Sequence, residues 1–328
     1  MLEIVALTVI LAILFDISNG WNDSANAIAT VVSTRVLSPR WAVTMAACMN
    51  ILGAMASTAV AKTIGKGVVD PSGITEGVVV SALIAGFVWN GAMTLIGLPV
   101  SASHALIGSL MGAAAAHAGW GVLNASGLQK IFAALLISPV IGLAMGFLLM
   151  KLILRFFGHT SPGTLNKRFG RLQLLSSAFM AFGHGSNDAQ KVMGIITLSL
   201  FSGGYIATID VPRWVVLVCA IAMGLGTAMG GWKVIRTIGV RMLRLEPVHG
   251  FAAETAATAV ILGASHVGLP VSTTHVITST IMGVGATRRL SAVRWGVAGK
   301  IVAAWVFTLP ACIVFAWIIE RFIFSKVL

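Results

Sequence analysis

Two pairs of polar motifs stand in an otherwise apolar sequence, one pair in each half of the chain. Asn22–Asp23 is followed by Gly97–His104 (GLPVSASH), and Asn187–Asp188 is followed by Gly268–His275 (GLPVSTTH). Carboxylate and amide oxygens in a membrane segment can bind a small cation or a proton. Hydroxyls and free backbone N–H groups can bind an anion. The doubled pattern predicts a transporter whose two halves contribute broken helices to one binding site.

The GLPVS motifs should each end one helix and start another. Proline lacks an amide donor and disfavours helix in the residue before it, and glycine weakens the helix further. A helix can restart at Ser101 or Ser272, and its positive N-terminal end attracts anions. The alternative is a serine-capped kink used only for packing. The predicted oxyanion ligands are Ser101, Ser103, Ser272, Thr273 and Thr274, completed by Asn22 and Asn187.

The Asn–Asp pairs place ionisable groups inside hydrophobic segments, where such residues are costly and mark ion or proton paths. Asp23 and Asn26 are three residues apart, so they share a helix face and could ligate Na⁺ through oxygen together with Asp188. Asp23 or Asp188 could instead take up a proton, because burial disfavours the charged carboxylate. A structural polar cluster that closes a helix break is the remaining alternative.

Two further charged residues join the predicted cation or proton site. Lys191 stands three residues after Asp188, where the first half has Asn26. Its ammonium group could pair with Asp188, fill a cation site, or attract the anion. Glu254 lies near the start of a span, about one span before the second GLPVS motif, which favours a functional role over a lipid-facing carboxylate.

Other chemistry finds little support in the sequence. Zinc sites need clustered ligands, and neither His104 nor His275 belongs to a Cys/His spacing, so we expect no cofactor or metal apart from Na⁺. Neither a metal motif nor a nucleophile–base spacing indicates an enzyme. The three cysteines, Cys48, Cys219 and Cys312, are scattered in apolar runs and are predicted to be packing residues.

The elements that position these motifs are predicted to be membrane helices. The chain is 57% hydrophobic and 10% charged, whereas soluble domains are about 25% charged. Apolar stretches near the length of a membrane span, roughly 20 residues, recur throughout. We expect an all-α polytopic membrane protein with ten segments, at 2–34 (broken near 18–24), 41–61, 76–97, 100–118, 128–154, 172–200, 212–232, 249–268, 271–287 and 296–320.

Further landmarks extend the repeat over the whole chain. Pro39–Trp41 recurs as Pro212–Trp214, and Lys130–Ile131 recurs as Lys300–Ile301. The offsets of 165 to 173 residues imply a few small insertions. A long repeat with several landmarks is a strong signal. The predicted division is a first repeat at 1–156, a basic cytoplasmic connecting loop at 157–170 and a second repeat at 171–328.

Loop charge orients the two repeats. If the segments cross alternately, one set of loops holds 15 of the 22 basic residues, including Arg288, and the other holds six, including Lys326. The positive-inside rule places the richer set in the cytoplasm and both termini outside. A hairpin at 100–118 would move the basic loop 155–171 outside unless another segment also failed to cross. Five crossings are an odd number, so the second repeat should be inverted.

At the motif residues the chain resembles the inorganic phosphate transporter (PiT) family, which is marked by paired Asn–Asp and paired Gly-Leu-Pro-Val-Ser motifs. The resemblance covers nearly the whole chain. It implies secondary uptake of phosphate across the plasma membrane, driven by sodium or protons. Some bacterial members look like sulfate permeases, so sulfate stays an alternative substrate. The short loop near 156–171 suggests a compact prokaryotic form.

Two departures from the family bear on coupling. Sodium-coupled relatives often have Asn where Lys191 stands, and they tend to have Glu near Asn50. Both changes weaken a second cation site and favour a proton or a single sodium. The resulting prediction is an alternating-access symporter of phosphate with H⁺ or Na⁺ that sits in the lipid bilayer. The +12 charge is attributed to cytoplasmic loops and not to nucleic acid. An anion channel and a homodimer stay open.

Overall fold

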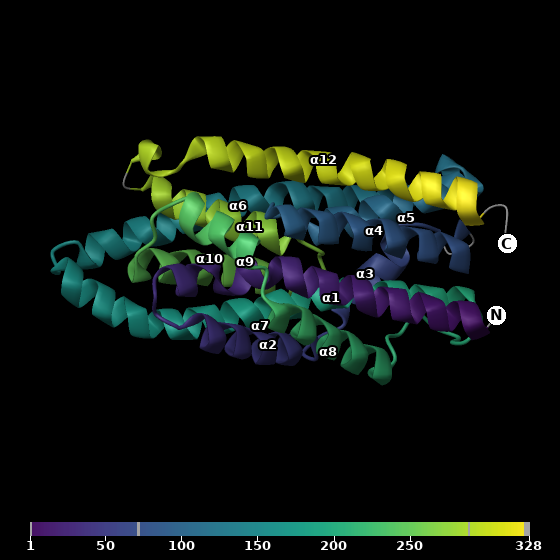
Figure 1. Cartoon of the computed structure of the whole chain (residues 1–328), viewed down its shortest axis with the longest axis horizontal. Helices are drawn as coiled ribbons and strands as arrows, with labels where there is room; N and C mark the ends of the chain where they lie inside the picture. Colours follow the sequence, from purple (N-terminus) through teal and green to yellow (C-terminus); the bar gives the residue numbers. More distant parts are fainter. Residues whose placement is uncertain (1, 71–72, 288, 325–328) are drawn as a thin grey trace.

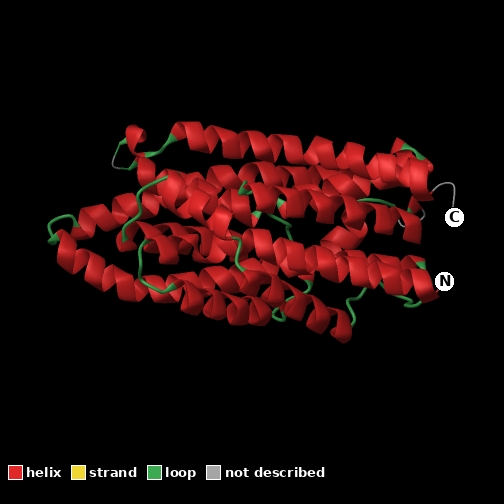
Figure 2. Ribbon diagram, in the orientation of Figure 1, coloured by secondary structure: helices red, strands yellow, loops and turns green. Residues whose placement is uncertain are grey.

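The described residues form an all-helical bundle, which confirms the predicted fold class (Figure 2). The computed structural model describes residues 2–70, 73–287 and 289–324. The axes of the longer helices are roughly aligned along the long axis of the molecule (Figure 1). In chain order the helices are α1 (Leu2–Ser33), α2 (Pro39–Ala54), α3 (Ala59–Gly67), α4 (Glu76–Ile96), α5 (Ala102–Ala118), η2 (Trp120–Val122), α6 (Ala125–Phe157), α7 (Pro162–Ser202), α8 (Arg213–Met229), α9 (Trp232–Arg236), η3 (Thr237–Arg241), α10 (Pro247–His266), α11 (Thr273–Ala286), η4 (Leu290–Ala292), α12 (Trp295–Ile319) and η5 (Glu320–Phe324).

The predicted break near 18–24 is wrong, because α1 is continuous through that segment. Its polar side chains bond sideways to other helices and leave the helical hydrogen bonds of α1 intact. The Asn22 amide donates to Thr94 on α4, and the Ser24 hydroxyl accepts from the Gly231 amide beside α8. Polar residues here indicate contacts between helices, and not an interrupted helix.

The helix breaks fall in two other segments, each predicted as a single span. The 41–61 segment is the pair α2 and α3, bent by 68° at residues 55–58. The 212–232 segment corresponds to α8, and a bend of 62° at its end leads into α9 and η3, which continue to Arg241 beyond the predicted bounds. By length and hydropathy each bent pair could cross a membrane, as could α1, α4, α6 and α12.

The α4–α5 pair is a re-entrant hairpin. The Ser81 hydroxyl, near the start of α4, donates to Glu320, and the ring of His117, near the end of α5, contacts the same carboxylate at 3.1 Å. The beginning of α4 and the end of α5 therefore lie at one end of the bundle. The chain therefore enters and leaves this hairpin at the same end of the bundle.

The α10–α11 pair forms the equivalent hairpin at the opposite end of the bundle. Pro247 opens α10 just after Leu243, whose side chain packs against Gly285 near the end of α11. The Arg294 amide, which follows α11, donates to the Met242 carbonyl at 3.0 Å. The chain thus enters and leaves this hairpin at the same place.

These hairpins preserve the inversion predicted from loop charge. Each hairpin returns to the end of the bundle at which it begins, so it does not change whether the number of crossings in each half is odd. The second half therefore stays inverted. The start of α1 and the end of η5 lie at one end of the molecule, and the α6–α7 connection lies at the other (Figure 1). Arg288 and Lys326, counted in the loop charges, lie outside the described residues.

The predicted connecting loop at 157–170 is mostly helix. Pro162 occupies the first turn of α7, so residues 162–170 already belong to that helix, and only 158–161 separate it from α6. Proline is well tolerated in a first helical turn, where its missing N–H would have no partner. Lys167, Arg168 and Arg171 are exposed on this part of α7, while Phe169 is buried in the apolar core.

Candidate functional site

Each GLPVS motif ends one helix and starts another, as predicted, and the two motifs form the tips of the hairpins, which the sequence did not predict. Gly97 and Gly268 adopt the left-handed conformation, with φ of +79° and +71°, which ends α4 and α10. A residue with a β-carbon would be strained there. The Ser101 hydroxyl then accepts from the His104 amide at 3.1 Å, and the Ser272 hydroxyl accepts from the His275 amide at 3.3 Å. These bonds start α5 and α11.

The tips of the two hairpins touch each other. The Ser103 hydroxyl of the first hairpin donates to the Val271 carbonyl of the second at 3.1 Å. The rings of His104 and His275 lie 4.8 Å apart between centroids, and His275 stacks on Trp305 at 3.9 Å. The N-terminal ends of α5 and α11 therefore face one region, to which both halves contribute.

Asn22 and Asn187 hold the hairpins to the long helices in equivalent ways. The Asn22 amide donates to Thr94 at 2.7 Å, and the Asn187 amide donates to Ser265 at 2.9 Å. Each acceptor stands three residues before the hairpin's glycine. Asn187 also accepts from the Val271 amide at 3.3 Å. The two asparagines thus act as matching positioning groups.

Thr273 and Thr274 connect the second hairpin to the acidic residues. The Thr273 hydroxyl donates to Asp188 at 2.8 Å, and the Thr274 hydroxyl donates to Asp23 at 3.0 Å. The Asn26 amide donates to the Thr274 oxygen at 2.9 Å. All five side chains are at most 1% exposed. The structure therefore brings predicted anion ligands and predicted cation ligands into one buried cluster.

Lys191 lies beside Asp188, which matches the first of its three predicted alternatives. Its ammonium group donates to the Asp188 carboxylate and, at 2.8 Å, to the Val271 carbonyl. It is buried, with 1% of its surface exposed. A buried ammonium group needs such partners to offset its lost hydration. Lys191 joins α7 to the tip of the second hairpin.

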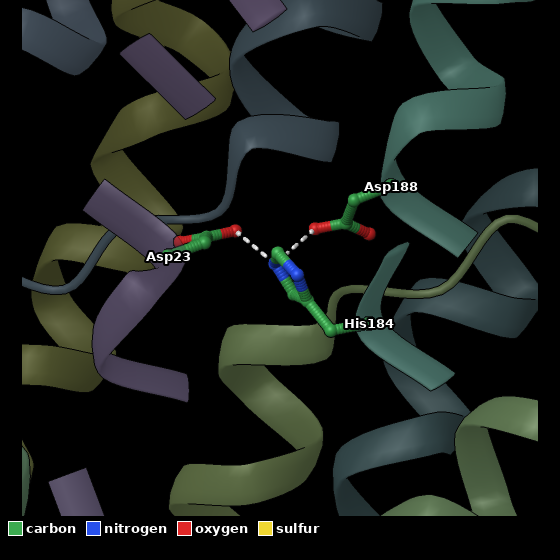
Figure 3. A group of neighbouring side chains, drawn as sticks. All are labelled: Asp23, His184 and Asp188. Atoms are coloured by element: carbon green, nitrogen blue, oxygen red, sulfur yellow. Dashed lines mark ion pairs between the residues drawn. The ribbon is translucent and has the colours of Figure 1, made fainter. Parts of the chain in front are cut away.

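His184 completes the cluster, and the sequence did not reveal its role. Its Nε2 atom lies 3.4 Å from Asp188 and 3.7 Å from Asp23 (Figure 3). The ligand atoms of the three residues all lie within 4.8 Å of one another. The spacing of His184 and Asp188, four residues apart on one helix, was the available signal. The contact to Asp23 depends on the packing of α1 against α7.

The other ring nitrogen of His184 has a partner on a third helix. Its Nδ1 atom lies 2.9 Å from the Asn50 side-chain oxygen, and the Asn50 amide donates to Thr227 at 2.8 Å. Asn50 is the position where the resemblance implied a glutamate. In this chain it orients the imidazole between the two aspartates.

Glu254 lies apart from this cluster, in a set of neutral donors. Thr30 donates to its carboxylate at 2.5 Å, Gln173 donates at 3.1 Å, and Ser176 donates to its other oxygen. Glu254 is fully buried. Thr30 stands seven residues after Asp23, two turns along α1, so Glu254 flanks the central cluster at a distance of about 10 Å along the helix.

The central cluster leaves specific oxygens without donors. Asn22 Oδ1 and Asn26 Oδ1 are buried and have no hydrogen-bond partner among the described residues. They stand on either side of Asp23, whose carboxylate is also buried. Oxygen ligands of this kind suit a small hard cation.

The helical bundle, the two opposed hairpins and the buried cluster between their tips are typical of a polytopic membrane transporter. Residues 19–316 match the model of the phosphate transporter family. The chain therefore belongs to this family.

Curated relatives agree with this membership. The chain is 47% identical over 313 residues to a "Probable low-affinity inorganic phosphate transporter" of Bacillus subtilis (strain 168). The aligned region covers 94% of this chain and 94% of the relative. It is 46% identical over 302 residues to a protein of the same description from Rhizobium meliloti (strain 1021), covering 92% of this chain and 90% of the relative. A solved structure titled "The sodium-dependent phosphate transporter" superposes with a TM-score of 0.91 at 26% identity, covering 99% of this chain and all of the other.

Proposed function

We propose that this chain carries inorganic phosphate across the plasma membrane by cation symport, with both termini outside. The main support for this proposal is that the two hairpin tips meet. There the N-terminal ends of α5 and α11, one from each half, face a buried polar cluster. Family membership and the sodium-dependent structural neighbour support phosphate and sodium as the transported pair. Relative motion of the repeats 1–156 and 171–328 would expose the site to each side in turn.

The anion would bind between the starts of α5 and α11. Free backbone N–H groups there and the positive helix ends favour negative charge. Lys191 supplies a nearby positive charge. The Ser101 and Ser272 hydroxyls cap the helices. Ser103, Thr273 and Thr274 lie in the first turns. Their single hydroxyl protons bond to Val271, Asp188 and Asp23 in this structure and would have to turn to the anion when it binds. Asn22 and Asn187 hold these tips in place.

The coupling cation would bind on the first-half side of the cluster. Asp23 supplies a carboxylate, and Asn22 and Asn26 supply amide oxygens without donors. On the second-half side the Lys191 ammonium group already neutralises Asp188. This asymmetry favours one Na⁺ for each phosphate. A proton on Asp23 is the alternative, and it predicts uptake that follows a pH gradient without sodium.

The test is uptake of labelled phosphate into proteoliposomes under separate sodium and proton gradients. The double variant Ser101→Ala/Thr273→Ala should lower uptake at least about tenfold, the effect of losing about 1.4 kcal/mol of binding. Thr280→Ala is the matched control, because the Thr280 hydroxyl bonds only to the Ile277 carbonyl of its own helix. Unchanged uptake by the double variant would contradict the proposed anion site.

Sulfate transport is the second candidate function. Phosphate and sulfate share a tetrahedral shape and differ in protonation near neutral pH. The site offers carboxylate acceptors at Asp23 and Asp188 for a phosphate proton, which favours phosphate. Competition settles the choice, since excess sulfate should leave phosphate uptake unchanged.

A further inference from the structure

Asp16 is a buried carboxylate that the proposed anion and cation sites do not use. Its side chain is fully buried, and neither carboxylate oxygen has a hydrogen-bond partner among the described residues. Buried charges in proteins are normally paired or bind metal ions. An unpartnered carboxylate in the middle of α1 therefore indicates a ligand.

The position of Asp16 on α1 places it in line with the central cluster. Asp16 and Asp23 are seven residues apart, so they lie on the same face of the helix, two turns or about 10 Å apart. Glu254 bonds to Thr30, which lies seven residues beyond Asp23. Three carboxylates thus mark one line along α1, with Asp16 nearest the end of the bundle where the chain begins.

Helix α4 brings an amide side chain to the level of Asn19, which lies three residues, or about one turn, after Asp16. Phe15 packs on Gly86, since a β-carbon on Gly86 would lie 2.7 Å from the Phe15 ring, and Asn22 bonds to Thr94. The two helices therefore run parallel, with residue numbers offset by 71 or 72. Asn19, which lies between Phe15 and Asn22 on this face, must stand level with Asn90.

Asn19 and Asn90 carry unused oxygens. Asn19 Oδ1, Asn90 Oδ1 and Asn90 Nδ2 are all buried and lack partners among the described residues. A proton on Asp16, or a bond from the Asn90 amide, would satisfy one oxygen and leave others without a donor. A cation satisfies carboxylate and amide oxygens together, because hard cations take several oxygen ligands at once.

Among the described residues, the positive groups that act on Asp16 are His184 and Lys191, and both have other partners. Asp188, His184 and Lys191 interact electrostatically with Asp16. Asp16 in turn interacts with the thiol of Cys219 on α8. Lys191 is bonded to Asp188, and His184 lies between Asp188 and Asp23. These charges are committed to the central cluster.

We propose that Asp16, Asn19 and Asn90 form a binding site for a small monovalent cation, Na⁺, separate from the site at Asp23. This inference rests on the proposed function. The site at Asp16 would bind the coupling cation transiently as the cation moves to or from Asp23. Carboxylate and amide oxygens are the ligands, and the positive charge of Na⁺ neutralises Asp16.

The test is binding of ²²Na⁺ to the purified full chain in detergent, at constant ionic strength with choline chloride. Asp16→Asn should lower the number of Na⁺ bound per chain by one, or weaken one phase of binding at least about tenfold. Ser18→Ala is the control, because the buried Ser18 hydroxyl bonds only to the Phe15 carbonyl and should leave binding unchanged. Asn90→Ala should act in the same direction as Asp16→Asn.

Wild-type ²²Na⁺ binding by a folded Asp16→Asn variant, verified by its unfolding temperature, would overturn the inference. So would a variant whose proton uptake changes while its Na⁺ binding does not, since Asp16 would then hold a proton. The proposed function fails separately. A wild-type chain that binds Na⁺ through Asp16 but takes up no phosphate contradicts symport and leaves this site intact.

Discussion

The ammonium group of Lys191 is hydrogen-bonded to the carboxylate of Asp188, three residues earlier on α7. The equivalent positions on α1 are Asn26 and Asp23, and there the amide of Asn26 bonds to Thr274 while its oxygen has no partner among the described residues. The two halves are alike in their hairpins and differ in charge. The second half carries its positive charge as the side chain of Lys191, and in the proposed function the first half binds a cation from solution.

Replacing Lys191 should therefore change both stability and sodium dependence. Lys191→Met removes the ammonium partner of the buried Asp188 and leaves it with Thr273 and His184, and breaking a buried pair costs about 3–5 kcal/mol. Added NaCl should restore part of the lost unfolding temperature, because Na⁺ can take the place of the ammonium group. Thermal unfolding in NaCl and in choline chloride measures this. Lys191→Met with wild-type stability in both salts would show that the pair contributes nothing.

His184→Gln should impair transport more than folding. Glutamine keeps a hydrogen-bonding group near Asn50 but removes the imidazole that separates Asp23 from Asp188. The two carboxylates then face each other without it, and like charges repel. Phosphate uptake should fall at least about tenfold, while size-exclusion chromatography shows a folded chain. Uptake close to wild type would assign His184 a packing role only.

Glu254→Gln separates the flanking carboxylate from the central cluster. Thr30, Gln173 and Ser176 all donate to Glu254, so an amide would turn two of its hydrogens toward groups that are already donors. Because these contacts do not include the hairpin tips, phosphate should still raise the unfolding temperature. Uptake should fall at least about tenfold. A variant that loses both properties together would place Glu254 in the binding site itself.

Much of the fold could be predicted from local signals. Gly97 and Pro99, like Gly268 and Pro270, end a helix by their own backbone chemistry, so the hairpin tips were found at the right residues. The sequence could not show that the chain turns back there. A serine-capped restart looks the same whether the next helix continues or returns, and loop charge was satisfied by both arrangements because a pair of hairpins does not change whether the number of crossings in each half is odd.

The site was predictable where residues act locally and not where packing decides. Asp188 and Lys191 share a helix face by spacing alone, and their contact follows. The break predicted at 18–24 was wrong because the polar groups of Asn22 and Ser24 bond to other helices. His184 escaped notice because its meeting with Asp23 depends on how α1 packs against α7.

Gly283→Ala should destabilise the α6–α11 contact. A β-carbon on Gly283 would overlap the carbonyl oxygen of Leu143, which is backbone and cannot move alone. Forcing the two helices apart should cost about 1–3 kcal/mol. Gly91→Ala is the control, because a β-carbon on Gly91 meets nothing within 4 Å. Equal unfolding temperatures for the two variants would contradict the close packing of α11 on α6.

Labelling of single cysteines tests whether α4 and α5 together return the chain to one side of the membrane, and it tests the orientation of the chain. With Cys48, Cys219 and Cys312 replaced by alanine, a cysteine at Trp120 or Asp210 should react with an impermeant maleimide added to intact cells. A cysteine at Leu290 should react only after permeabilisation. Cysteines at Trp120 and Asp210 should be labelled from the same side only if α4 and α5 together return the chain to the side where α4 begins. The shared contact of Ser81 and His117 with Glu320 indicates that they do. Labelling of Trp120 and Asp210 from opposite sides would show that α5 crosses the membrane alone. Labelling of Leu290 but neither of the others in intact cells would keep the hairpins and reverse the orientation.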